Sequence, residues 1–233
     1  MQGPEFEYIL RESRRARAIR LKVTPERGLE VIVPAGCNRI RIGPLLDGKR
    51  DWIRSALHWA QARRPAPWRP PERIALPAIG RAWNVVTQAA AGSAVAVREV
   101  AGEALALSGD IACGPACRAA LQGWLRAQAQ RALPPWLQAL GRGIGSRPPA
   151  RVSIRRQRTR WGSCSPRRAI CLNACLLFLE PGAVGYVLIH ELCHLEAMNH
   201  GRGFWALVAR HCPDYRNFRA VLRQSWRAVP DWA

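Results

Sequence analysis

The chain has little lysine and few acidic side chains. Lys22 and Lys49 are its only lysines, so arginine supplies nearly all of the formal net charge of +20 that 36 basic and 16 acidic residues produce. This balance favours an anionic partner, such as nucleic acid, nucleotide phosphate or an acidic substrate. A composition rich in arginine, alanine, proline and glycine explains it equally well, because net charge describes non-specific binding and not fold.

Other absences exclude whole classes of protein. No two of the eight cysteines stand as C-x-x-C, so zinc-ribbon and thioredoxin folds lose their main support. No run reaches the ~20 apolar residues of a membrane span. Residues 1–5 lack the basic and apolar regions of a secretory signal. Since 48% of residues are apolar, we expect a globular protein. From the missing signal and span we expect a cytoplasmic protein with reduced thiols and no membrane partner.

Three of the five histidines stand in one short stretch, residues 190–200, which reads HELCHLEAMNH. His190 and His194 are four residues apart, so on a helix both imidazoles can point at one ion. Glu191 lies beside them, badly placed for ligation but well placed to hydrogen-bond a water on the metal. This is the pattern of a zinc hydrolase, with two ligands, a carboxylate base and an open position for water. We predict one Zn²⁺ ion, with Glu191 as the catalytic residue.

The surrounding residues favour a buried helix for this pair. Pro181 suits a first helical turn, because it has no N–H to leave unpaired. The run 184–195 is apolar nearly all round. A buried helix that carries two imidazoles and a carboxylate needs partners for them, and a bound cation supplies those partners.

His200 is the favoured third ligand. Asn199 and Gly201 favour a turn that could swing its imidazole back toward the metal. The spacing matches that of the metzincins, although Ala197 stands where that group carries glycine. The alternatives for the third ligand are His211 and Asp214, about one helix later.

The rest of the pattern predicts two domains in an α+β fold. Residues 1–110 would form a β-rich module: a hairpin within 6–33, a helix over 45–64, and short strands between 73 and 108 that could join the hairpin in one antiparallel sheet. Residues 115–226 would form a zincin-like catalytic domain, a small antiparallel or mixed sheet with an active-site helix. Its first helix, over 115–142, should be kinked or divided at Pro134 and Pro135. We expect the tail at Asp231 to fray.

Arginines crowd the strands predicted at 151–158 and 169–173. Arg158 or Arg160, placed near the metal, would bind substrate or stabilise an oxyanion in the transition state. Surface arginines that merely hold the hairpin are an equal alternative. A strand beside the metal helix also offers an edge to which an extended peptide could add.

At these residues the chain resembles the YgjP-like metallopeptidase family, which is related to the SprT-like and WLM zinc peptidases. The likeness is strongest over about 150–222, and weaker at Arg14-Arg15 and at 31–34, which look like the family's opening hairpin. The resemblance implies that His190, His194 and His200 are zinc ligands and that Glu191 is the catalytic carboxylate. The motifs that carry it are Arg160–Ser165, Leu172-Asn173, Tyr186–Leu192, Asn199-His200, Phe204-Trp205 and Pro213–Tyr215.

The predicted function is therefore a zinc-dependent metallohydrolase, with a metallopeptidase favoured by the strand edge and by the resemblance. One alternative is a metal-dependent nucleoside triphosphate (UTP) pyrophosphatase, which the arginines favour; such an activity has also been attributed to this family. A second alternative is a nucleic-acid-associated binding protein with a structural metal. An open coordination position beside a glutamate argues against it, because structural zinc is normally closed by four protein ligands.

Overall fold

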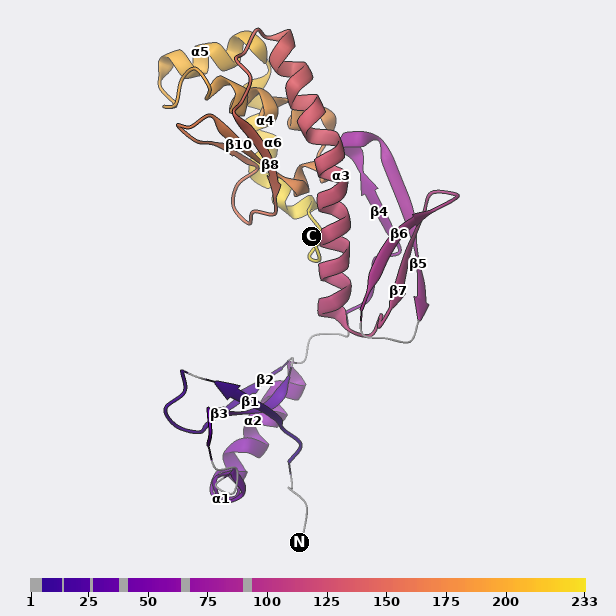
Figure 1. Cartoon of the computed structure of the whole chain (residues 1–233), viewed down its shortest axis with the longest axis vertical. Helices are drawn as coiled ribbons and strands as arrows, with labels where there is room; N and C mark the ends of the chain where they lie inside the picture. The colour runs from indigo at the N-terminus through magenta and orange to yellow at the C-terminus, as the bar shows by residue number, and fades with distance from the viewer. Residues whose placement is uncertain (1–5, 14, 26, 38–41, 64–67, 90–93) are drawn as a thin grey trace. The chain divides into compact units, whose positions relative to one another are not determined.

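The computed structural model describes residues 6–13, 15–25, 27–37, 42–63, 68–89 and 94–233 (Figure 1). Arg14, one of the residues of the resemblance, lies outside this set. The chain forms two compact units, one that ends at Trp68 and one that runs from Arg69 to Ala233. None of the helices in the described part of the chain is both long and apolar enough to cross a bilayer.

The first unit is a three-stranded sheet with two helices. Its elements are β1 (Ile9–Ser13), β2 (Arg20–Thr24), β3 (Gly28–Pro34), α1 (Ile42–Asp47) and α2 (Arg50–Ala62). β3 is the central strand, antiparallel to β2 and parallel to β1. The predicted hairpin is thus β2–β3, and the predicted helix is observed as α1 and α2. The core is made by apolar residues of β3 and both helices, namely Leu29, Val31, Val33, Ile42, Leu46 and Ile53.

The second unit begins with a four-stranded sheet, in the order β4-β5-β7-β6. Its strands are β4 (Arg73–Leu76), β5 (Arg81–Ala89), β6 (Ala96–Val100) and β7 (Ala104–Gly109), with a 3₁₀ helix η2 (Pro77–Ile79) after β4. The short strands predicted between 73 and 108 are present. The prediction of one antiparallel sheet shared with the first hairpin was wrong. The sheet is not wholly antiparallel, because the chain forms the edge strand β6 first and β7 then returns parallel to β5. Each sheet is separate from the other.

Helix α3 (Gly114–Gly143) packs on this sheet and runs uninterrupted through Pro134 and Pro135. The two prolines do not divide it, since Leu133 and Leu137 on either side are fully buried and hold the helix by packing. Trp124 of α3 lies edge-on to Trp83 of β5, with ring centroids 5.0 Å apart.

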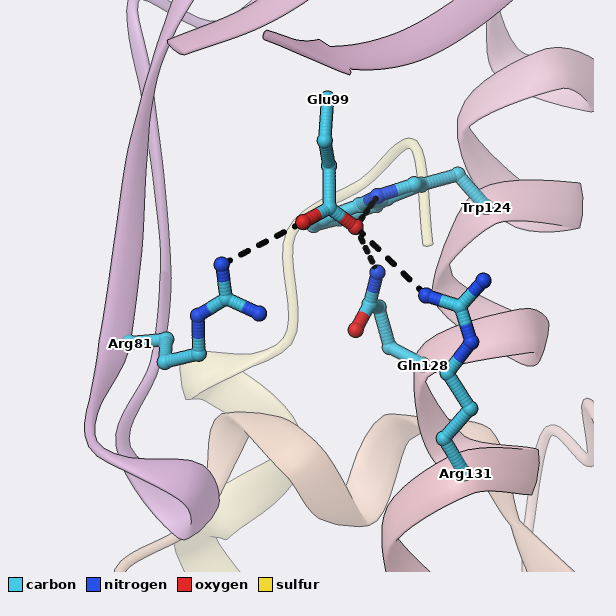
Figure 2. A network of polar contacts seen from close by, with 5 residues as sticks. All are labelled: Arg81, Glu99, Trp124, Gln128 and Arg131. Atoms are coloured by element: carbon cyan, nitrogen blue, oxygen red, sulfur yellow. Dashed lines mark hydrogen bonds and ion pairs between the residues drawn. The ribbon is translucent and has the colours of Figure 1, made fainter. Parts of the chain in front are cut away.

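A polar network around Glu99 of β6 joins the sheet to α3 (Figure 2). Its carboxylate accepts hydrogen bonds from Trp124 Nε1 at 3.3 Å and from Gln128 Nε2, and it pairs with Arg81 at 3.3 Å and Arg131 at 3.9 Å. The carboxylate is partly buried, and these partners satisfy its oxygens. The sheet therefore belongs with α3, and the compact units divide at residue 68 whereas the sequence predicted a boundary between 110 and 115.

The remainder of the second unit lies on the other side of α3 from the four-stranded sheet (Figure 1). It holds a mixed sheet of order β8-β10-β9, in which β10 is parallel to β8 and antiparallel to the edge strand β9. The architecture is α+β, as predicted. The elements are β8 (Arg151–Arg155), β9 (Gly162–Cys164), β10 (Ala169–Asn173), η3 (Ala174–Phe178), α4 (Pro181–Cys193), α5 (Arg202–His211), α6 (Tyr215–Gln224) and η4 (Ser225–Ala228).

The last residues are docked and not frayed. Trp232 and Ala233 are buried, and their carbonyls accept hydrogen bonds from Gln122 Nε2 at 2.6 Å and an Arg156 guanidinium at 2.8 Å. The predicted fraying of the tail at Asp231 was wrong, because the tryptophan that follows this polar residue is buried.

Candidate metal centre

Helix α4 carries His190 in its last turn, and His194 is the C-cap residue that follows the helix directly. The helix begins at Pro181 in the first turn, and its apolar run buries it between α3, α5, α6 and β9. The helix ends at Cys193, and the chain then turns, with Ala197 N bonded to Cys193 O at 2.9 Å and Gly201 N to Asn199 O at 2.8 Å. These turns return the chain to the helix, so His200 lies against His190.

The three histidines form one cluster. Their ligand atoms all lie within 4.8 Å of one another, and the Nε2 atoms of His190 and His200 are 3.1 Å apart. Two nitrogens bound to a tetrahedral zinc ion at 2.0–2.1 Å would lie roughly 3.3 Å apart, so this spacing fits a shared ion. Imidazole donors suit zinc. Neither His211 nor Asp214 belongs to the cluster within the described residues.

The tautomer of His194 and the lowered pKa values of His190 and His194 favour the binding of a cation. His194 Nδ1 lies 3.1 Å from the carbonyl oxygen of Ala197. A carbonyl only accepts, so Nδ1 carries the proton and Nε2 keeps its lone pair; metal-binding histidines usually donate their other N–H in this way. Burial and the neighbouring His194 and His200 lower the pKa of His190 to about 3, and burial lowers the pKa of His194. Both rings are thus neutral at pH 7, the form that binds metal.

Phe204 of α5 forms the floor of the cluster. It is 1% exposed, and its ring centroid lies 4.9 Å from that of His190, 4.4 Å from that of His194 and 4.7 Å from that of His200. One buried aromatic ring in contact with all three imidazoles restricts their rotation. This contact explains the phenylalanine of the Phe204-Trp205 motif.

Glu191 is 4% exposed, and its Oε2 atom is buried without a hydrogen-bond partner among the described residues. Burial raises its pKa to about 8. Strand β9 lies directly over the carboxylate: a Cβ atom on Gly162 would stand 2.6 Å from Oε1. Glycine is required at this position for space, so that the edge strand can close over the glutamate.

Asn173 holds the segment that leads into β9. Its side chain is fully buried; Nδ2 donates to the carbonyls of Gln157 at 2.7 Å and Arg160 at 2.8 Å, and Oδ1 accepts from Cys175 N at 3.0 Å. Its own N–H donates to the carbonyl of Trp161 at 2.9 Å. This explains the Leu172-Asn173 motif: one amide sets the course of the chain that covers Glu191.

The structure leaves Arg158 and Arg160 exposed, and no described side-chain contact joins either of them to the histidines. Arg219 of α6, which the sequence analysis did not single out, does face the site: its guanidinium lies 4.8 Å from the centre of the Trp205 ring, and its charge contributes to the lowered pKa of His190. The sequence does indicate this basic face, because Arg216, Arg219 and Arg223 fall on one side of a helix.

Comparison with known proteins identifies the family of the chain. The profile described as YgjP-like, metallopeptidase domain, matches residues 17–225. The crystal structure of the metallopeptidase zymogen of Pyrococcus abyssi abylysin is similar at 27% identity over 38% of this chain and 91% of that chain, with a TM-score of 0.32. No curated protein matches the chain. The match covers most of the sequence, and the chain belongs to the YgjP-like metallopeptidase family.

Proposed function

We propose that this protein is a zinc-dependent metallopeptidase in which His190, His194 and His200 hold the ion and Glu191 is the catalytic base. One observation carries the proposal: three imidazole ligand atoms within 4.8 Å of one another stand next to a buried carboxylate oxygen that has no partner in the described residues. A carboxylate buried for structure alone would be paired. One kept for proton transfer is left free to meet water.

The chemistry follows from these side chains. A divalent cation held by the three imidazoles would polarise the substrate carbonyl and favour the ionised form of Glu191. Glu191 then accepts a proton from the attacking water molecule and passes it to the leaving amine. The Ala197 carbonyl keeps His194 in the tautomer that leaves Nε2 free for the ion.

A peptide substrate suits the edge of the sheet. β9 pairs with β10 on one side only, and it covers Glu191 through Gly162. An extended peptide that added to the free side of β9 would gain main-chain hydrogen bonds and pass close to the glutamate. The sequence predicted such an edge on a strand beside the metal helix, and β9 is the candidate because it is the edge strand that lies against Glu191.

The test combines metal analysis with a cleavage assay. Purified protein should contain zinc and should cleave an unfolded protein such as casein, and a chelator should abolish cleavage. Glu191→Gln should keep the metal and lose about 10²–10⁴ in rate, the usual contribution of a general base. If cleavage by Glu191→Gln equals that of the parent while the metal stays bound, this mechanism is refuted.

A metal-dependent UTP pyrophosphatase is the second candidate. Four arginines line a cavity beside His200, and guanidinium groups bind phosphate through paired hydrogen bonds. Release of pyrophosphate from UTP without peptide cleavage would replace the first candidate by this one. A nucleic-acid-binding role with a structural metal is supported least, because the cluster offers three ligands within the described residues and structural zinc takes four.

A further inference from the structure

A cavity of about 790 Å³ opens beside His200, the exposed member of the histidine cluster. Four arginines line it, one at the start of α5 and three on α6. No acidic residue is among the described residues of its wall. We name this cavity the arginine pocket, after Arg202, Arg216, Arg219 and Arg223.

The three arginines of α6 are placed on one face by their spacing. Arg216, Arg219 and Arg223 stand at i, i+3 and i+7, while Phe218 and Leu222 between them are partly buried. Like charges at these spacings repel one another. Among the described residues, none of the four pocket arginines pairs with a carboxylate. A bound anion would supply the counter-charge that relieves this repulsion.

The pocket is also pre-organised. The Arg219 guanidinium lies over the ring of Trp205, which in turn stacks on Tyr215 with centroids 5.4 Å apart. Arg216 Nε donates to the Tyr215 hydroxyl at 3.3 Å. Guanidinium groups already held on aromatic rings lose less conformational entropy when they bind an anion.

The same aromatic rings connect the pocket to the histidines. The centroid of Trp205 lies 5.6 Å from that of His200 and 6.0 Å from that of His190. An anion in the pocket is therefore a near neighbour of any bond that meets the ion. Arginine forms paired hydrogen bonds with a carboxylate, so the wall of the pocket matches that group in charge and in shape.

We propose that the arginine pocket binds the carboxylate of an aspartate or glutamate of a peptide substrate, within a few residues of the bond that is cut and on the His200 side. This inference rests on the proposed peptidase function and names its substrate class: peptides that are acidic beside the cleavage site.

The experiment begins with a peptide mixture from a digested proteome. After incubation with the zinc-loaded protein, mass spectrometry of the products should show Asp and Glu enriched on one side of the cut. For a matched pair of peptides that differ by Glu or Gln at that position, kcat/KM should differ by about 10- to 100-fold, the range of one or two charge-assisted hydrogen bonds.

Variants of the pocket test its arginines. Arg219→Gln with Arg223→Gln should reduce the preference to within about threefold, whereas Arg223→Lys should keep part of it, because the charge remains and the paired geometry is lost. Arg210→Gln is the control: this arginine is exposed on α5 and does not line the pocket, so the preference should stay unchanged. Circular dichroism checks that each variant is folded.

A binding arm separates this inference from the proposed function. Fluorescence anisotropy of the labelled Glu and Gln peptides on Glu191→Gln protein measures recognition without cleavage. Tighter binding of the Glu peptide that is lost in the pocket variants supports the inference even if no peptide is cut. Cleavage without acidic preference, equal binding of both peptides, or UTP hydrolysis with no peptide binding overturns it.

Discussion

The histidine cluster and the surroundings of Glu191 are adjacent, yet they are built in opposite ways. All three imidazoles come from one stretch of eleven residues, joined by a helix end and two turns. The cover of Glu191 comes from β9, whose course is set by Asn173 on another strand. Local spacing brings the three histidines together, and tertiary packing buries the carboxylate. Changes to the cover should therefore alter the glutamate and spare metal binding.

The largest expected effect concerns the stability of the metal-free protein. The raised pKa of Glu191, about 8, means that the unfolded chain releases a proton between the ordinary value of 4.5 and 8 that the folded chain keeps. The contribution of Glu191 to the free energy of unfolding is therefore fully present below pH 4.5. It is lost as the pH rises to 8, by on the order of 4 kcal/mol. Glu191→Gln removes this loss.

Urea unfolding in the presence of a chelator measures this loss of unfolding free energy. At pH 8 Glu191→Gln should be more stable than the parent by several kcal/mol, and at pH 5 by less than about 1 kcal/mol. The exposed Glu72→Gln should leave the free energy of unfolding within ~0.5 kcal/mol at both pH values. Equal stability of Glu191→Gln and the parent at pH 8 would show that the carboxylate is not held in its neutral form.

The second effect separates fold stability from the ion site. Asn173→Ala leaves two carbonyls and one N–H without their partner in a fully buried place, which should cost about 3 kcal/mol of unfolding free energy. The control Asn217→Ala, at an exposed position of α6, should cost less than ~0.5 kcal/mol. Where Asn173→Ala is folded, zinc affinity should match that of the parent. A large loss of zinc affinity would mean that the histidines depend on the same packing.

The third effect is on activity alone. Gly162→Ala places a methyl group 2.6 Å from Glu191 Oε1, so the carboxylate or β9 must move. A displacement near 1 Å costs about 100-fold in rate, roughly 2.7 kcal/mol of transition-state stabilisation. Gly123→Ala is the matched control, because an added Cβ there meets nothing within 4 Å. Parent-like peptide cleavage by Gly162→Ala would contradict the close cover described here.

The same contrast explains what the sequence could predict. The clustering of the three histidines follows from spacing on one helix end and a turn, and the strands of 73–108 follow from short alternating runs, so both could be predicted. Sheet partners do not follow from local pattern: the parallel pair β5–β7 depends on where β6 lies. The roles of Gly162 and Asn173 required tertiary contacts, although the RWGSC and Leu-Asn motifs marked the segments. The spacing of the arginines of α6 also indicates one basic helical face, but these residues lie outside the histidine motif at 190–200 and were not predicted as part of the site.

The most direct test of the central claim is X-ray absorption spectroscopy of the zinc-loaded protein. We expect four light-atom ligands, with the scattering pattern of three imidazoles near 2.0–2.1 Å and one further oxygen. His200→Ala should lower the imidazole number to two. Sulfur ligands near 2.3 Å, or an imidazole number that His200→Ala does not change, would contradict an ion shared by His190, His194 and His200.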